Sequence, residues 1–496
     1  MDIQPDQELH HEIFGSVLDQ TEMTPFLLKP ASDYATSLKQ ASRMMANRGF
    51  DTMESTELRE SECKRAVQYI RHAYAYFFKE LFPFVSDQLD GLASMRSPNE
   101  ALYRTCREAI NDVATILTDG AFQRLVNEDP RHLLLMASSR KYPFVFCGYQ
   151  ERSFAVPPAW QQVACCLLKM VHLIKSVEED SQDINDYSQL GFFLEAEGVG
   201  LNDLYKFDWE HPDYIPDTEP AQRAFVKISS FFHRLRESLS FNREKGCLVF
   251  NSGDGVEVDI AEVKARLKSP GSMVTKLGKD VEGEAFDIRD ILAITFILKD
   301  MDDTLKLFHA LQKRGVILQE NTASHSITQT LFNNPASMKE AVRRLMISLA
   351  KGRGQSELPG EANVESAAAT FYGALSKNAE KNVHTSKGHR KFQCKIGFAV
   401  PIHRSLATNE ILIPGTQLFS ERDSISKRTE QHTLGVELRI SDVESWRASE
   451  QTGESHHEAY KFRQLVSVMN RVFKNMFNLP AEKFDQLRKD QAALFS

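Results

Sequence analysis

The chain has 496 residues, which is longer than a typical single domain, so two domains are expected. Its 42% hydrophobic and 26% charged residues are ordinary for a soluble globular protein. The formal net charge of −8 argues against a general nucleic-acid coat, and no internal repeat or low-complexity tract is visible.

Cysteine usage and the apolar segments indicate the compartment. None of the seven cysteines shows C-x-x-C spacing, which favours free thiols in a reducing cytoplasm. The first thirty residues are acidic and lack the apolar core of a signal peptide. The most apolar helix, 163–174, is too short to span a bilayer. A cytoplasmic protein without a membrane partner is therefore expected.

The first half of the chain predicts helices. Residues 33–130 repeat apolar side chains at three- and four-residue spacing, and further helices are expected over 159–177 and 221–239. Residues 142–147 fit a strand or a buried loop equally well. We interpret residues 1–245 as a helical domain whose role the sequence does not indicate.

Cationic and hydroxyl side chains then recur at fixed spacing. Arg266 and Lys268 are two positions apart, so an extended backbone places them on one side. Ser269–Pro270 predicts a helix start, and Ser272 and Lys276 share a face of that helix. The segment predicts a polyphosphate-binding cradle in which both lysines are exposed. The alternative is a solvated basic helix start.

An acid precedes the next apolar segment. Asp290 stands directly before the run 291–298, which is rich in β-branched residues and predicts a buried strand. A carboxylate at the start of a buried strand, close to a phosphate cradle, is a natural magnesium ligand. A helix cap or a strand-edge cap is the alternative role for this residue.

The remaining elements are expected to complete an α+β domain with a mixed sheet over residues 246–478, followed by a tail over 479–496. They are a helix from Asp300 or Asp302 to about Gly315, a strand over 316–318, about two helices in an insertion at about 337–380 interrupted at 352–360, strands over 392–402, 411–418 and 432–441, and a helix over 454–476. The insertion would serve as a lid or a partner site.

The pattern R-x-K-S-P-x-S-x-x-x-K, followed by D-I-x-D-x-x-A and an apolar strand, resembles the synthetase domain of RelA/SpoT-type alarmone synthetases. Lys387–Arg390 resembles the family's glycine–aromatic acceptor loop, and Val436–Ile440 resembles the strand that carries its catalytic glutamate. His456, Tyr460 and Lys461 resemble its closing helix. The resemblance covers roughly residues 240–475 and implies a nucleotidyltransferase-like fold.

The resemblance also implies an activity, which is Mg²⁺-dependent pyrophosphoryl transfer from ATP to a nucleotide 3′-hydroxyl, with GTP or GDP as candidate acceptors. It implies that the ATP phosphates are bound by Arg266, Lys268, Ser272 and Lys276. Asp290 and Glu437 would be the catalytic acids and the Mg²⁺ ligands, with Glu437 also taking the proton of the acceptor hydroxyl. The acceptor would be bound by Lys387, His389 and Arg390.

The chain departs from the family pattern at three positions. His389 replaces a tyrosine, and Thr295 and Ser441 replace arginines. These departures concern the acceptor more than the donor, because the cradle and both acids remain.

The basic stretch 376–395 and His389 keep open an RNA or tRNA 3′ end as the acceptor. Thr295 and Ser441 keep open a non-catalytic nucleotide-binding or scaffold protein. We prefer the enzyme, and the oligomeric state is not indicated.

Overall fold

The computed structural model describes residues 39, 41, 56–95, 99–137, 156–180, 209, 219–279, 288, 290–318, 327–354, 359–376, 390–406, 426–451, 457–473, 476 and 480–492. The chain divides into two compact units that alternate along the sequence. Unit 1 comprises residues 1–179, 270–285 and 450–496, and unit 2 comprises residues 180–269 and 286–449. This division differs from the boundary expected at residue 245. Residues 180–245 group with the unit that contains the sheet, and two later segments group with the N-terminal helices.

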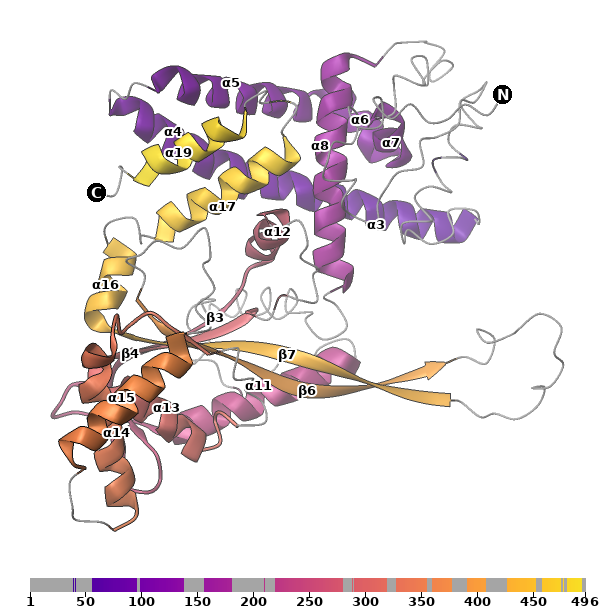
Figure 1. Ribbon diagram of the computed structural model, residues 1–496. Helices are drawn as coiled ribbons and strands as arrows, with labels where there is room; N and C mark the ends of the chain where they lie inside the picture. The colour runs from indigo at the N-terminus through magenta and orange to yellow at the C-terminus, as the bar shows by residue number, and fades with distance from the viewer. Residues whose placement is uncertain are drawn as a thin grey trace, which may run out of the picture. The chain divides into compact units, whose positions relative to one another are not determined.

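All the elements described in unit 1 are helical (Figure 1). They are α3 (Thr56–Ala75), the π-helical turn η1 (Tyr76–Leu81), α4 (Phe82–Ser94), α5 (Glu100–Leu117), α6 (Gly120–Glu128), α7 (Arg131–Ala137), α8 (Pro158–Lys175) continuing into η3 (Ser176–Asp180), α12 (Pro270–Lys279), α17 (His457–Val472) and α19 (Ala481–Ala492). The aromatic stripe on α3 and η1 is core, since Phe77 stacks on Phe82 and packs against Phe473 at ring distances of 5.3 Å each.

The described cysteines fit the expectation of free thiols. Six of them are described and none forms a disulfide, and Cys165 and Cys166 are buried on α8. Burial raises the pKa of the Cys166 thiol to about 11, so this thiol is unreactive near neutral pH. Among the described helices, none is long and apolar enough to cross a membrane.

Unit 2 is built on a seven-stranded mixed sheet with the order β1-β2-β3-β4-β7-β6-β5. The strands are β1 (Leu239–Asn242), β2 (Cys247–Asn251), β3 (Glu257–Leu267), β4 (Leu292–Leu298), β5 (Thr328–Gln329), β6 (Phe392–Leu406) and β7 (Ser426–Asp442). Among these strands, all of which lie in the described residues, only the β4–β7 pairing is parallel. Its helices are α11 (Glu219–Glu237), η6 (Met301–Asp303), α13 (Thr304–Lys313), α14 (Pro335–Gly352), α15 (Glu361–Ser376) and α16 (Val443–Gln451). The expected α+β class with a mixed sheet is confirmed.

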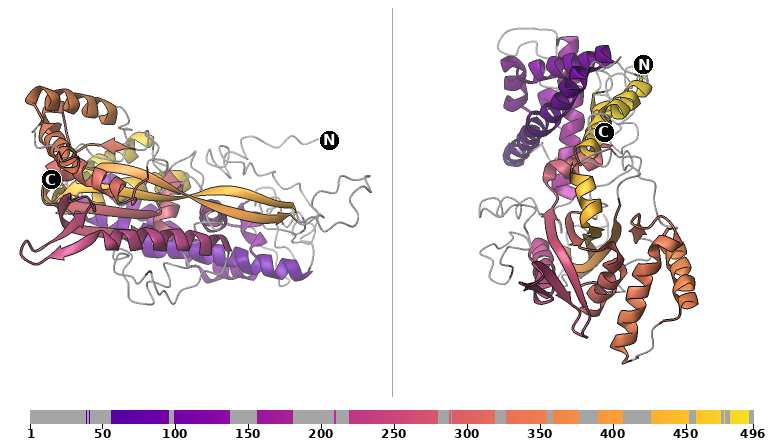
Figure 2. Two further views of the ribbon diagram at one scale, coloured as in Figure 1. Left: turned by 90° about the horizontal axis from the view of Figure 1, so that it is seen from below. Right: turned by 90° about the vertical axis from the view of Figure 1, so that its left-hand side faces the viewer.

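Strand register gives the sheet one apolar face and one polar face. Residues paired across neighbouring strands share a face, and successive residues alternate between faces. One face is lined by Ala265, Ile294, Leu438 and Cys394, which form one cross-strand row. Helices α11 and α13 cover this face, with Phe231 against Phe398 at 5.7 Å and Phe308 against Phe392 at 5.1 Å (Figures 1 and 2).

The prediction of a strand over residues 316–318 is wrong. Gly315 ends α13 with φ at 65°, and the backbone amides of Val316 and Ile317 then donate to the carbonyl of Leu311 at 3.0 and 3.2 Å. The amides are therefore satisfied by a helix end rather than by a neighbouring strand. Val316 and Ile317 are buried, so the apolar run reflects a buried helix cap. The strand expected over 411–418 lies outside the described residues.

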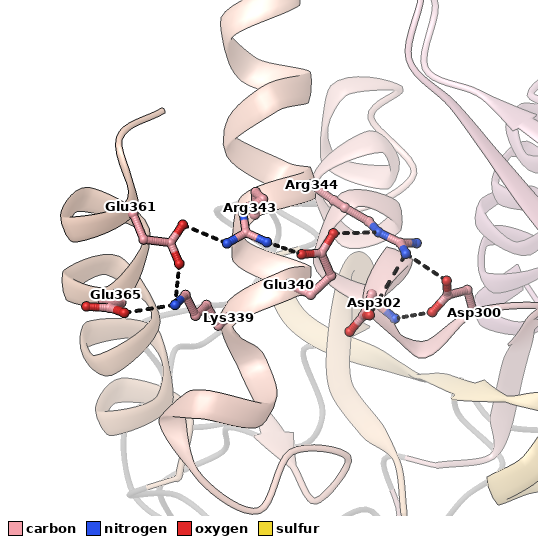
Figure 3. Close-up of polar contacts among 8 residues, drawn as sticks. All are labelled: Asp300, Asp302, Lys339, Glu340, Arg343, Arg344, Glu361 and Glu365. Carbon is pink, nitrogen blue, oxygen red and sulfur yellow. Dashed lines mark hydrogen bonds and ion pairs between the residues drawn. The ribbon is translucent and has the colours of Figure 1, made fainter. Parts of the chain in front are cut away.

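The two helices expected in the insertion are α14 and α15, and ion pairs connect them (Figure 3). Arg343 bridges Glu340 and Glu361 at 2.5 and 2.7 Å, while Lys339 bonds both Glu361 and Glu365. Arg344 bonds Asp300, in the turn that follows β4, at 2.8 Å (Figure 3). This contact anchors α14 at the end of β4 opposite to Asp290.

Candidate functional site

The second face of the sheet carries the predicted catalytic glutamate. Arg266 on β3 pairs with Ala293 on β4, Ala293 pairs with Glu437 on β7, and Glu437 pairs with Lys395 on β6. These four residues therefore share one face, which we call the polar face. Glu437 itself is only 3% exposed, whereas Lys395 is exposed. Arg439, two positions along β7, donates from Nη2 to Oε2 of Glu437 at 2.6 Å.

The electrostatic surroundings of Glu437 bring the two predicted acids into one cluster. Burial alone would raise the pKa of Glu437, but Arg439 and Lys391 outweigh it and lower the pKa to about 2. Asp290 opposes this shift and Arg266 adds to it, so both side chains are close enough to act on Glu437. The surrounding cations therefore favour the ionised form of Glu437, which is the form in which a carboxylate binds a metal ion.

Asp290 lies at the start of β4, bonded to a residue of the cradle. The Nζ of Lys268 donates to Oδ2 of Asp290 at 2.5 Å, and the two side chains are 10% and 15% exposed. The backbone amide of Lys268 also donates to the carbonyl of Ile291 at 2.7 Å, which continues the β3–β4 pairing. The expectation that Lys268 is exposed is therefore wrong, because its ammonium is held against a carboxylate.

The predicted cradle is divided between the two units. Arg266 and Lys268 belong to unit 2 with both acids, whereas Ser272 and Lys276 lie on α12 in unit 1. The helix does begin at Pro270 as predicted. Ser272 is exposed and Lys276 is partly exposed, so both side chains are accessible at the first turns of α12.

Unit 1 holds α12 by hydrogen bonds in its middle and near its C-terminal end. The hydroxyls of Tyr76 and Thr275 are 2.8 Å apart, and Nη1 of Arg471 donates to the carbonyl of Leu277 at 2.6 Å. The carboxylate of Glu80 lies against Gly271, where any Cβ would overlap it. A carboxylate beside a helix N-terminus is favourable because that end carries partial positive charge. Glu80 therefore occupies part of the space where the cradle was expected to receive phosphate.

The structure describes only some of the predicted acceptor-binding residues. Lys387 and His389 lie outside the described residues, as does His456. Arg390 is described, and its Nη2 donates to the carbonyl of Leu331 at 2.6 Å, so it supports the backbone there. Ser441 donates to the carbonyl of Arg390 at 3.3 Å. Of the closing-helix motif, Lys461 on α17 in unit 1 places its Nζ 4.7 Å from the ring centre of Phe84.

Sequence reasoning missed Arg439 and Lys391 as members of the site. Arg439 could have been found, because it stands two positions after Glu437 and must share its face in a strand. Lys391 could not, because its approach to Glu437 depends on how β6 pairs with β7. Desolvation, followed by repulsion from Arg439, lowers the pKa of Lys391 to about 8.

The residues of the polar face fit a magnesium–polyphosphate ligand. Within the described residues, no three His, Cys, Asp or Glu side chains are grouped so that they could hold a metal ion by themselves. Magnesium is commonly held by one or two carboxylates together with substrate phosphates. Asp290 and Glu437 supply two carboxylates, and the surrounding cations suit the phosphates.

Comparison with known proteins found no match among family models, curated proteins or solved structures. The function is therefore inferred from the residues of the site.

Proposed function

We propose that this chain catalyses Mg²⁺-dependent pyrophosphoryl transfer from ATP to a nucleotide hydroxyl, on a nucleotidyltransferase-like fold. The observation that carries the proposal is the charge imbalance on the polar face. Among the described residues around the two acids, Asp290 and Glu437 are grouped with four partly buried cations. These are Arg266, Lys268, Lys391 and Arg439. Partly buried charge in excess costs stability unless a counter-charge joins it, and a polyphosphate supplies that counter-charge.

Each group has a role in such a transfer. Arg266 and Lys268 would bind the donor phosphates, while Asp290 and Glu437 would hold Mg²⁺, which neutralises phosphate charge when bound. The acceptor hydroxyl would give its proton to Glu437 as its oxygen forms a bond to the β-phosphorus. The bond from that phosphorus to the α,β-bridging oxygen breaks, so AMP leaves with the electron pair. Such reactions depend on positioning and charge neutralisation more than on covalent catalysis.

A second candidate function is nucleotide binding without transfer. Both acids already have cationic partners, since Lys268 bonds Asp290 and Arg439 bonds Glu437. Such pairs satisfy a charged cluster without a metal, which is what a purely structural or ligand-sensing site requires.

The test is incubation of the full-length chain with Mg²⁺ and ATP labelled in its β- and γ-phosphates. GDP, GTP and an RNA with a free 3′-hydroxyl are offered separately, and the products are resolved chromatographically. AMP together with a labelled nucleotide supports the proposal, and label on RNA would identify the 3′ end as the acceptor. ATP binding without AMP formation supports the second candidate, and the absence of ATP binding contradicts both.

A further inference from the structure

The acids of the turn that follows β4 share one cation. The guanidinium of Arg344 on α14 contacts four carboxylates, which are those of Asp300 at 2.8 Å, Asp303 at 3.3 Å, Glu340 at 3.4 Å and Asp302 at 3.9 Å. Figure 3 shows Arg344 between its own helix and this turn. Burial, followed by repulsion from Asp300, raises the pKa of Asp302. Without Arg344 the acids would repel one another, so the turn would move.

This turn, η6, contacts Arg390, which directly precedes Lys391 and β6. Met301 begins η6, and its Sδ accepts a hydrogen bond from Nη2 of Arg390 at 3.3 Å. The same Nη2 donates to the carbonyl of Leu331 at 2.6 Å. The position of Arg390 therefore depends on the turn that Arg344 holds.

The segment leading into α14 holds the next residue, Lys391. The amide of Lys391 donates to Oγ1 of Thr330 at 3.0 Å, and its carbonyl accepts from the amide of Thr330 at 2.7 Å. Thr330 and Leu331 lead into α14, which begins at Pro335. The helix that carries Arg344 is thus connected to the start of β6 by its own entry segment as well as by η6.

Lys391 in turn acts on the predicted catalytic glutamate. Burial raises the pKa of Glu437, and Arg439 and then Lys391 lower it, so the ammonium of Lys391 lies within electrostatic reach of this carboxylate. Within the described part of the chain, Arg344 contacts the four acids and no residue of the polar face. An effect of Arg344 on Glu437 therefore passes through η6, α14 and the start of β6.

We propose that Arg344 is a positioning residue for the transfer reaction. By holding the acids of η6 against α14, it fixes Arg390 and Lys391 before β6, and so sets the charge beside Glu437. This inference rests on the proposed function for its effect on transfer, but its effect on Lys391 is independent of that function.

The matched control is the preceding residue of the same helix. Arg343 bonds Glu340 at 2.5 Å and Glu361 at 2.7 Å, so its contacts join α14 to α15 rather than to η6. Loss of Arg343 removes a comparable pair of ionic contacts from α14 while η6 keeps its cation. A difference between the two variants therefore reports the contact with η6.

The first experiment observes Lys391 in the full-length chain. Lysine carrying ¹³C is incorporated, Lys391→Arg identifies the signal by NMR, and the pH is varied. Wild type should titrate with a pKa of about 8. Arg344→Met should move this pKa toward about 10.4, the value of an unperturbed lysine, because a displaced ammonium is better solvated and farther from Arg439. Arg343→Met should leave it unchanged.

The second experiment measures transfer and donor binding. Arg344→Met should lower the rate of AMP formation about tenfold or more, since a displaced group beside the reacting atoms is poorly placed. Affinity for α,β-methylene-ATP, whose α,β bond resists transfer, should stay unchanged. Arg344→Lys keeps the charge and should recover part of the rate. Arg343→Met and Lys351→Gln, the latter at an exposed lysine on α14, should transfer as wild type does.

The outcomes separate this inference from the function on which it rests. The positioning role is overturned if Lys391 titrates alike in wild type and Arg344→Met, or if Arg343→Met lowers transfer as much as Arg344→Met. Absence of AMP formation by wild type contradicts the proposed function, and the titration of Lys391 then still decides the inference. If thermal unfolding shows that Arg344→Met is not folded, Arg344→Lys takes its place and should raise the pKa of Lys391 by less.

Discussion

The two faces of the central sheet arise from alternate residues of the same strands, yet they have different roles. On β7, Val436, Leu438 and Ile440 are fully buried against the apolar core, while Glu437 and Arg439 between them form a charged pair. The apolar face is closed by α11 and α13, and the described residues of the polar face carry more positive than negative charge. We infer that the apolar face supplies stability and that the polar face exchanges some stability for ligand binding.

The largest expected effect is a difference in folding stability between a substitution on the apolar face and one on the polar face. Phe296→Ala removes a fully buried ring from the apolar face of β4 and should lower the free energy of unfolding by about 3–5 kcal/mol. Thr295→Ala, at the neighbouring residue on the polar face, should cost much less. Denaturant unfolding of both variants checks this contrast. Equal losses would show that both faces are packed as core.

The next largest effect is expected in the rate of transfer from ATP, and it distinguishes Glu437 from a neighbouring residue of the polar face. Glu437→Gln keeps the shape of the side chain but removes a charge, and should lower transfer from ATP by about a hundredfold or more. Folded Thr295→Ala should remain much closer to wild type, because its hydroxyl is not required to hold Mg²⁺. The measurement is the rate of AMP formation. Full activity in Glu437→Gln would exclude the carboxylate from the reaction.

The Lys268–Asp290 pair should contribute to stability as well as to binding. Lys268→Met leaves a mostly buried carboxylate without its bonded cation and should destabilise the fold by about 1–3 kcal/mol. Lys268→Met combined with Asp290→Asn should recover much of that loss, because neither charge is then left without the other. A double-mutant cycle by denaturant unfolding measures the coupling. Additive losses would show that the two side chains do not interact.

Substitution of Lys391 should change stability in the opposite direction. Its pKa is lowered to about 8, below its value of about 10.4 in an unfolded chain, so the folded state disfavours the charged form. Lys391→Met should therefore raise stability by an amount that is constant below pH 8. The gain should shrink as the pH rises from 8 to about 10.4 and then vanish. Thermal unfolding across this range checks the window, and a destabilised variant at pH 7 would contradict it.

Local sequence signals predicted the elements that bear the site. Ser269–Pro270 marked the start of α12, the run after Asp290 marked β4, and alternation on β7 indicated that Glu437 faces away from the apolar set. Such signals depend on neighbours in sequence. The buried cap at 316–318 was mistaken for a strand, because burial of a short apolar run does not specify its backbone.

Long-range pairing could not be predicted from the sequence. The bond between Lys268 and Asp290, the register that sets Lys395 opposite Glu437, and the approach of Lys391 all depend on which strands become neighbours. The grouping of residues 270–285 and 450–496 with the N-terminal helices is equally non-local. No local pattern indicated that the cradle motif crosses from one compact unit to the other.

The central claim is that the polar face binds the phosphates of ATP. Calorimetric titration of the full-length chain with α,β-methylene-ATP and Mg²⁺ tests it most directly, comparing wild type with Arg266→Gln and with Lys351→Gln. Wild type and Lys351→Gln should bind with equal affinity, and Arg266→Gln should bind about tenfold or more weakly, since a charge-assisted contact to phosphate is lost. Equal affinity in all three proteins, or no binding by wild type, would contradict the claim.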